Sequence, residues 1–232
     1  MLLSISGLIG SGKDTVADYL VNYMGFERES FASNLKDACS AIFGWDREML
    51  EGRTKEARAE RERVDEWWSN RLGIANLTPR WVLQNFGTEV CRNHFHIDVW
   101  LASLEYDLLK KRNSNIIITD ARFRNELDMV KRLGGYCLYV ERGNRPEWFD
   151  YAARYNGSSE EQKLNLQIIA DIDEQANIFN RRIHESEWRW IGFPFDTNID
   201  NNSTLEDLYK RCEGTINYLR SAPKVSRVAD YV

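Results

Sequence analysis

The chain of 232 residues has the size of one α/β domain with an inserted segment, or of a domain and a half. Hydrophobic residues make up 43% of it, enough for a sizeable core, and its net charge of −5 argues against a nucleic-acid-binding protein, which needs a basic face. The sequence shows no Cys-x-x-Cys pair, no signal peptide and no apolar run long enough to cross a membrane, so we expect a cytoplasmic protein with reduced thiols.

The hydrophobic pattern predicts strands and helices that alternate along most of the chain. Strands are expected at residues 2–6, 26–31, 115–120, 136–141 and 195–200, and helices at 13–24, 34–43, 97–111, 124–133, 158–181 and 204–219. Another helix opens at Thr78-Pro79 and is interrupted by Gly87, and Asn34 is a predicted N-cap. The alternating charges over residues 48–71 suit a solvated helix. This order predicts an α/β fold with a parallel sheet and a site at its carboxyl edge.

A glycine-rich segment separates the first strand from the first helix. Residues 7–15 read Gly-Leu-Ile-Gly-Ser-Gly-Lys-Asp-Thr, the Gly-x-x-x-x-Gly-Lys pattern of a phosphate-binding loop. We expect Gly7, Gly10 and Gly12 to turn the backbone with positive φ and expose N–H groups to an anion. The positive end of the helix dipole and Lys13 would face the same phosphates. The segment predicts a nucleotide-binding site, whereas the alternative is a plain turn with an exposed lysine.

The end of this loop departs from the usual pattern. Asp14 stands where Ser or Thr usually binds Mg²⁺, and Thr15 follows it. A Gly-Lys-x-Thr ending is similar to small-molecule kinases of the adenylate kinase type, whose magnesium is held largely through waters. Asp14 either accepts a hydrogen bond from a magnesium-bound water or caps the helix N-terminus, and the cap is favoured.

Further candidates follow at other strand and helix ends. Asp120, at the end of the strand predicted over 115–120, suits a magnesium-water ligand or a group that orients substrate, and the alternative is a helix cap. Arg122 supplies a partner for phosphate. Lys36 and Arg80 begin helices and could clamp a second phosphate, although each is also typical of a solvated surface.

The segment over residues 144–190 is polar, aromatic and rich in arginine. It suits a lid that brings cations over a phosphoryl group and excludes water, and the alternative is a surface helical hairpin. Gln84, one turn below Arg80, could read the edge of a base. The tail from Ser221 is expected to be mobile.

Five stretches together resemble the deoxynucleoside monophosphate kinases of tailed bacteriophages, best known from the T-even phages. The first two are Ser11-Gly12-Lys13-Asp14-Thr15 and Leu35-Lys36-Asp37-Ala38. The third joins Arg80 with Gln84, Gly87-Thr88-Glu89 and Asn93, and the fourth joins Asp120-Ala121-Arg122 with Val140-Glu141-Arg142. The fifth is the run from Asp196 through Asn201 to Leu208. His184 with Ser186-Glu187 is also similar to that family's lid element. The loop ending and the Asp-x-Arg element are similar to animal phosphomevalonate kinases as well, so the acceptor stays open.

The resemblance implies a P-loop kinase-type parallel sheet flanked by helices, with an inserted helical lid. It implies transfer of the γ-phosphoryl group of ATP, with Mg²⁺, to a deoxynucleoside 5′-monophosphate. The core would cover residues 1–143 and 191–220, with monophosphate-binding helices at about 34–112, the lid at 144–190 and a tail at 221–232. The partners would be nucleotides, with no nucleic acid or membrane; a homodimer is left open, and a phage-encoded chain would act in the host cytoplasm.

The resemblance also assigns roles by position. ATP would contact Gly7, Gly10, Ser11, Gly12, Lys13, Asp14 and Thr15, with Asn201 near its adenine. The acceptor would contact Lys36, Arg80, Gln84, Thr88 and Arg122. The catalytic candidates are Lys13, Asp120 and Arg142, and Thr15 or Asp14 would lie near magnesium. A GTPase switch is excluded because the sequence has neither Asp-x-x-Gly nor Asn-Lys-x-Asp. A non-catalytic nucleotide-binding regulator remains an alternative, but it would not need a second cluster of cations.

Overall fold

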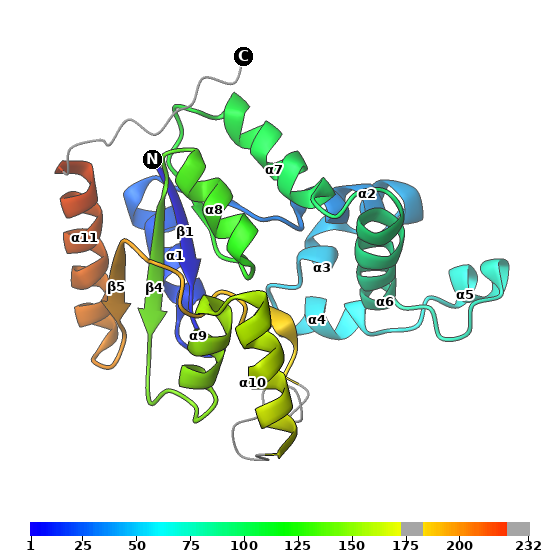
Figure 1. Cartoon of the computed structure of the whole chain (residues 1–232). Helices are drawn as coiled ribbons and strands as arrows, with labels where there is room; N and C mark the ends of the chain where they lie inside the picture. The colour runs from blue at the N-terminus through cyan, green and yellow to red at the C-terminus, as the bar shows by residue number, and fades with distance from the viewer. Residues whose placement is uncertain (173–182, 222–232) are drawn as a thin grey trace. The chain divides into compact units, whose positions relative to one another are not determined.

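The computed structural model describes residues 1–172 and 183–221 (Figure 1). The chain divides into two compact units, one made of Met1–Glu29 with Arg112–Val232 and the other of Ser30–Lys111. Residues 173–181 of one predicted helix and most of the predicted mobile tail lie outside the described residues. No helix in the described part of the chain is long and apolar enough to cross a membrane.

The first unit is built on a parallel sheet, as the sequence predicts. Its described strands are β1 (Leu2–Ser6), β2 (Glu27–Glu29), β3 (Ile116–Ile118), β4 (Tyr136–Glu141) and β5 (Thr197–Asp200), in the order β2-β3-β1-β4-β5. Every pairing between neighbours is parallel. The central position of β1 between β3 and β4 brings the loops after these three strands to one edge, where the strand order reverses.

Helices cover both faces of this sheet (Figure 1). Helices α1 (Lys13–Met24) and α11 (Leu205–Ser221) contact each other and form a core with the apolar strand residues. This core includes Leu3, Ile5, Val16, Leu20, Ile117, Leu138, Val140, Leu208 and Ile216, all almost completely buried. Helix α8 (Arg124–Arg132) contacts β1 and β4, and Figure 1 shows it on the other side of β1 from α1. The central strands β1, β3 and β4 are buried at consecutive positions, so both faces of the sheet contribute to the packed layers.

The arginine-rich insertion belongs to the first unit. It contains α9 (Phe149–Gly157), α10 (Glu160–Ile172) and a short 3-10 helix, η2 (Glu185–Glu187). The sequence predicts α10 within a longer helix over 158–181 but misses α9. Tyr151, Ala152 and Tyr155 of α9 are buried, so this helix has an apolar face of its own.

The second unit is helical. It contains α2 (Ser33–Phe43), α3 (Arg47–Glu51), α4 (Lys55–Arg61), α5 (Glu66–Leu72), α6 (Pro79–Gln84), the π-helix η1 (Asn85–Asn93) and α7 (Val99–Lys110). Its core includes Leu35, Cys39, Leu50, Leu77, Val82 and Trp100.

The single helix predicted over residues 48–71 is wrong. The charged stretch folds as α3, α4 and α5, because each helix has its own N-cap. Asp46, Thr54 and Asp65 each accept a hydrogen bond from the backbone N–H three residues later. Gly52 ends α3 in the left-handed conformation, with φ at 67°.

Two other local predictions for this unit are also corrected. Helix α2 begins at Ser33, and Asn34 is no N-cap: its amide donates to Ser103 Oγ at 2.6 Å and to Asp107 Oδ2 at 2.8 Å in α7. Gly87 does not interrupt the helix that Thr78 caps, because the chain continues as η1. A Cβ on Gly87 would lie 2.7 Å from Leu35, so this glycine lets the helical run approach α2.

Candidate functional site

The glycine-rich segment forms a loop between β1 and α1, as its sequence predicts. Gly10 and Gly12 adopt φ of 78° and 95°, and Ser11 N donates to Leu8 O at 3.1 Å. The prediction of positive φ is wrong for Gly7. Glycine is needed there because a Cβ would lie 2.5 Å from the carbonyl oxygen of Val140. The loop therefore passes close to the end of β4, which makes its shape dependent on a neighbouring strand.

Lys13, the first residue of α1, bends back over this loop. Its Nζ donates to the carbonyl oxygens of Gly7 at 2.7 Å and Leu8 at 2.9 Å. Burial and the charge of Arg122 lower the pKa of Lys13 from its ordinary value, and the carboxylates of Asp14 and Glu187 act in the opposite direction. The ammonium group thus lies where it can meet an anion held by the loop.

The segment after β5 braces the loop from the other side. Asn201 is 9% exposed, and its Nδ2 donates to the carbonyl oxygen of Ser11 at 2.8 Å. Its backbone N–H donates to Glu141 O at 2.8 Å, which extends the pairing of β4 and β5. A Cβ on Gly12 would collide with this amide. The predicted contact of Asn201 with adenine stays a prediction, and its observed bond is to the loop.

Asp14 does not cap α1. The N-cap is Gly12, and the exposed Asp14 carboxylate pairs with Arg28 of β2 at 3.3 Å. Thr15 is half-buried in the first turn. The described residues contain no cluster of three or more His, Cys, Asp or Glu side chains that could hold a metal ion. Metal ligands near the loop would therefore have to be completed by groups other than these side chains.

The Asp120–Arg122 segment leaves β3 beside the loop. Its backbone is fixed by the buried Glu126, whose Oε2 accepts from the N–H groups of Arg122 at 2.7 Å and Phe123 at 3.1 Å. Ser6 Oγ, at the end of β1, donates to Ala121 O at 3.3 Å. Asp120 is half-buried, and the Arg122 side chain is 48% exposed. The segment therefore presents a guanidinium from a rigid backbone at the carboxyl edge.

The predicted acceptor residues Lys36, Arg80, Gln84 and Thr88 lie in the second unit. Lys36 Nζ pairs with Glu51 at 3.0 Å, and Arg47 pairs with the same carboxylate at 2.7 Å. Burial would raise the pKa of Glu51, but hydrogen bonds from Arg47 and Lys36 and their charges lower it to about 2. The carboxylate therefore stays ionised and fixes both cations.

Arg80, Gln84 and Thr88 are exposed residues of the run formed by α6 and η1. Arg80 Nε pairs with Glu62 at 3.2 Å. Arg80 and Gln84 lie four residues apart in α6 and so share one face of that helix, whereas Thr88 lies in the π-helix η1. The roles of these three residues stay predictions.

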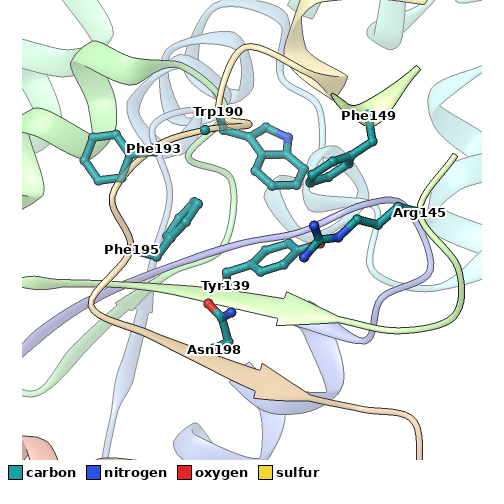
Figure 2. A pocket seen from close by; sticks show the side chains of 8 residues that line it. Tyr139, Arg145, Phe149, Trp190, Phe193, Phe195 and Asn198 are labelled. Carbon is teal, nitrogen blue, oxygen red and sulfur yellow. The ribbon is translucent and has the colours of Figure 1, made fainter. Parts of the chain in front are cut away.

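Arg142 is exposed directly after β4, whereas Arg145 has a structural role. Arg145 Nε donates to Glu141 at 2.8 Å, and its guanidinium lies 4.8 Å from the Phe149 ring centroid. Figure 2 shows Arg145 and Phe149 beside a pocket. The pocket has a volume of about 230 Å³ and is also lined by Tyr139, Trp190, Gly192, Phe193, Phe195 and Asn198.

The rings beside this pocket pack against one another. The Tyr139 ring centroid lies 5.6 Å from that of Trp190 and 5.7 Å from that of Phe195. Tyr139 and Trp190 are almost fully buried. The cluster therefore packs the end of the insertion, at Trp190, against β4.

Sequence reasoning missed the carboxylates that hold these predicted site residues. Glu126 fixes the Arg122 backbone, Glu51 holds Lys36, and Glu62 pairs with Arg80. A local signal existed for Glu126 alone, since Glu three residues after a helix N-cap is typical of a capping box. The partners of Lys36 and Arg80 come from other helices, so their spacing gave no signal.

The sequence is similar to those of known nucleotide kinases. The sequence model for deoxynucleotide monophosphate kinase matches residues 51–157. A protein of Acanthamoeba polyphaga mimivirus, provisionally named deoxynucleotide monophosphate kinase, is 33% identical over 156 residues, which cover 61% of this chain and 74% of the relative. The deoxynucleoside-5′-monophosphate kinase of Escherichia phage T5 is 27% identical over 179 residues, covering 56% of this chain and 72% of the relative.

Among solved structures, dephospho-CoA kinase from Campylobacter jejuni aligns over 94% of this chain and 96% of its own with 16% identity. The TM-score of this alignment is 0.43. The family model covers parts of both compact units, and the mimivirus relative is matched over most of its length. The chain therefore belongs to the deoxynucleotide monophosphate kinase family.

Proposed function

We propose that the chain transfers the γ-phosphoryl group of ATP to the phosphate of a deoxynucleoside 5′-monophosphate, giving the diphosphate. The observation that carries the proposal is the arrangement around Lys13. Its ammonium lies on the carbonyl oxygens of a phosphate-type loop, within the electrostatic reach of the separate cation Arg122. Two sets of positive charge at one sheet edge suit two phosphate tails, one from each nucleotide.

The protein's part in this reaction is positioning and charge stabilisation. The loop and Lys13 would hold the donor phosphates, and Arg122 would hold the acceptor phosphate together with Lys36 and Arg80 of the second unit. Asp120 would lie beside the transferred group and Arg142 over it, while Gln84 and Thr88 would contact base and sugar. In-line transfer needs little covalent chemistry from these side chains, because holding both phosphates in line lowers the barrier.

Mg²⁺ is the metal that this reaction needs. Oxygen donors near the loop include Asp14, Thr15 and Asp120, and the described residues hold no cluster of three or more His, Cys, Asp or Glu side chains, which suits a metal that keeps waters and takes its other ligands from phosphates. Thr15 or Asp14 would contact it directly or through water. When bound, it would neutralise negative charge on the donor phosphates.

The insertion over 144–190 would act as the lid of this enzyme and residues 34–112 as its monophosphate-binding region. The core would then be residues 1–143 and 191–220, followed by the tail at 221–232. Its partners would be small nucleotides, with no nucleic acid or membrane, and a homodimer is compatible with the proposal.

The test is a coupled assay of ADP release from ATP across a panel of acceptors. The panel should contain each deoxynucleoside monophosphate, each ribonucleoside monophosphate and phosphomevalonate. Acceptor-dependent ADP release with one or more deoxynucleotides is expected. Turnover with phosphomevalonate alone would favour a non-nucleotide acceptor, and tight ATP binding without any acceptor-dependent turnover would favour a regulatory protein.

A further inference from the structure

A carboxylate from the end of the insertion reaches the candidate acceptor arginine. Glu187, in η2, pairs its Oε1 with Arg122 Nη1 at 3.1 Å. The Glu187 side chain is 25% exposed and that of Arg122 is 48% exposed. The two residues are far apart in sequence but belong to the same compact unit.

The backbone that carries Glu187 is firmly anchored. The next residue, Trp188, is 1% exposed and packs edge-on against the Tyr155 ring of α9, with centroids 5.6 Å apart. Asn156, also on α9, donates from Nδ2 to the carbonyl oxygens of Trp188 at 2.8 Å and Ile191 at 2.9 Å. The carboxylate of Glu187 is therefore presented from a fixed backbone.

Arg122 is consequently held at two points. Glu126 binds its backbone N–H at 2.7 Å, and Glu187 binds one nitrogen of its guanidinium. A guanidinium has five N–H donors, so a contact at Nη1 leaves donors on the other nitrogens for a phosphate. The half-exposed side chain has room to make that contact.

We propose that Glu187 is a positioning residue that fixes the Arg122 guanidinium in the orientation that binds the acceptor phosphate. The inference rests on the proposed function and adds a residue to its acceptor site. A partly exposed ion pair contributes little to the free energy of unfolding, so a role in stability does not account for the Glu187–Arg122 pair. Fixing a flexible side chain before the ligand arrives lowers the entropic cost of binding.

Glu185→Gln is the matched control. Glu185 lies in the same 3-10 helix, has the same charge and pairs with Arg189 at 3.2 Å rather than with Arg122. We expect Glu187→Gln to raise the KM for the acceptor by about tenfold, while the KM for ATP stays within about twofold. Glu187→Asp, which keeps the charge, should raise the acceptor KM less than Glu187→Gln. Glu185→Gln should change neither constant.

A double-mutant cycle separates positioning from an independent effect. In the Arg122→Ala background, Glu187→Gln should no longer raise the acceptor KM, because the group it positions is gone. Additive effects of the two substitutions, an unchanged acceptor KM in Glu187→Gln, or a lower KM would each overturn the inference. Thermal unfolding of every variant establishes that it is folded.

The outcome for Glu187 is distinguishable from that of the proposed function. If the acceptor panel reveals turnover with a phosphorylated compound other than a deoxynucleotide, the proposed substrate is wrong. The same cycle is then measured with that compound, whose phosphate would still need Arg122. If no acceptor supports turnover, both proposals fail.

Discussion

The amide of Asn201 donates a hydrogen bond to the carbonyl oxygen of Ser11 at 2.8 Å, so the segment after the last strand supports the loop after the first. Asn201 is also fixed by its own backbone N–H, which donates to Glu141 O in the neighbouring strand. The shape of the phosphate loop therefore depends on a residue that comes 190 positions after Ser11 in the sequence.

Asn201→Ala should weaken phosphate binding. Removing the amide leaves the Ser11 carbonyl without this partner, at a cost of about 1 to 2 kcal/mol. Calorimetry with inorganic tripolyphosphate, which has no adenine, should show affinity reduced by about tenfold. Asn198→Ala, at an exposed position of β5, is the control. Unchanged tripolyphosphate affinity with weakened ATP binding would instead indicate that Asn201 contacts adenine.

Gly7→Ala should be far more damaging than Gly10→Ala. At Gly7 the added Cβ meets backbone, 2.5 Å from Val140 O, so the loop or β4 must shift. At Gly10 the space is open, and alanine faces only the strain of a left-handed backbone, about 1 kcal/mol. ATP affinity measured by calorimetry should fall at least about tenfold further in Gly7→Ala. Equal affinities in the two variants would show that the close approach to Val140 is unimportant.

Lys13→Ala should reduce the rate of phosphoryl transfer by several orders of magnitude, about 10³-fold or more. The ammonium that donates to the Gly7 and Leu8 carbonyls is lost from the loop. Single-turnover measurement of ADP formation gives the rate directly. Lys210→Ala, which removes an exposed lysine paired with Glu206 on α11, should leave the rate unchanged. Near-normal turnover in Lys13→Ala would refute the assigned role.

Arg122→Ala should mainly weaken binding of the monophosphate acceptor. Its guanidinium is half-exposed on a fixed backbone, and the loop that would bind ATP does not depend on this side chain. Titration calorimetry should show acceptor affinity reduced by about 10- to 100-fold, with ATP affinity nearly retained. Arg124→Ala, whose side chain faces the Phe193 ring, serves as the control. The reverse pattern, with ATP binding lost and acceptor binding kept, would contradict this role.

The Glu51 carboxylate should make the stability of the second unit depend on pH. Its pKa in the folded chain is about 2, below the ordinary 4.5, so its stabilising effect is complete above pH 4.5 and is lost as the pH falls toward 2. Hydrogen exchange within residues 30–111 should show Glu51→Gln less stable than the original chain at pH 7, by about 1 to 2 kcal/mol after solvent screening is allowed for.

The difference between Glu51→Gln and the original chain should shrink as the pH falls toward 2, where the carboxyl is protonated in the unfolded chain and about half protonated in the folded chain. Glu48→Gln, an exposed position in the same helix, is the control. An equal difference between the two chains at both pH values would show that Glu51 acts through packing rather than charge.

The sequence predicts most of the sheet and the loop because their signals are local. Apolar runs identify β1 and β4, and the spacing of Gly7, Gly12 and Lys13 defines the loop. The need for glycine at position 7 comes from Val140, which no local pattern reveals. The sequence therefore identifies the loop but gives a wrong reason for one of its glycines.

Most of the failures have tertiary causes, whereas the division of the charged stretch is local. Asn34 has the residue type of an N-cap, but partners in α7 take its amide. The charged stretch after Glu48 has a helical composition, yet local caps divide it into short helices. The partners of Arg122 and Lys36 are carboxylates brought in by folding, Glu187 and Glu51. Single-sequence patterns carry no information on such contacts.

The path of the chain through the sheet has a wider consequence. Residues 30–111 leave after β2 and return at β3, and these two strands are hydrogen-bonded neighbours. Residues 30–111 can therefore be replaced or lengthened in evolution without a change in β1 or the glycine loop, because the two ends of this segment join adjacent strands. Under the proposed function, the contacts to base and sugar from residues 30–111 can then change while Arg122 and the glycine loop stay in place.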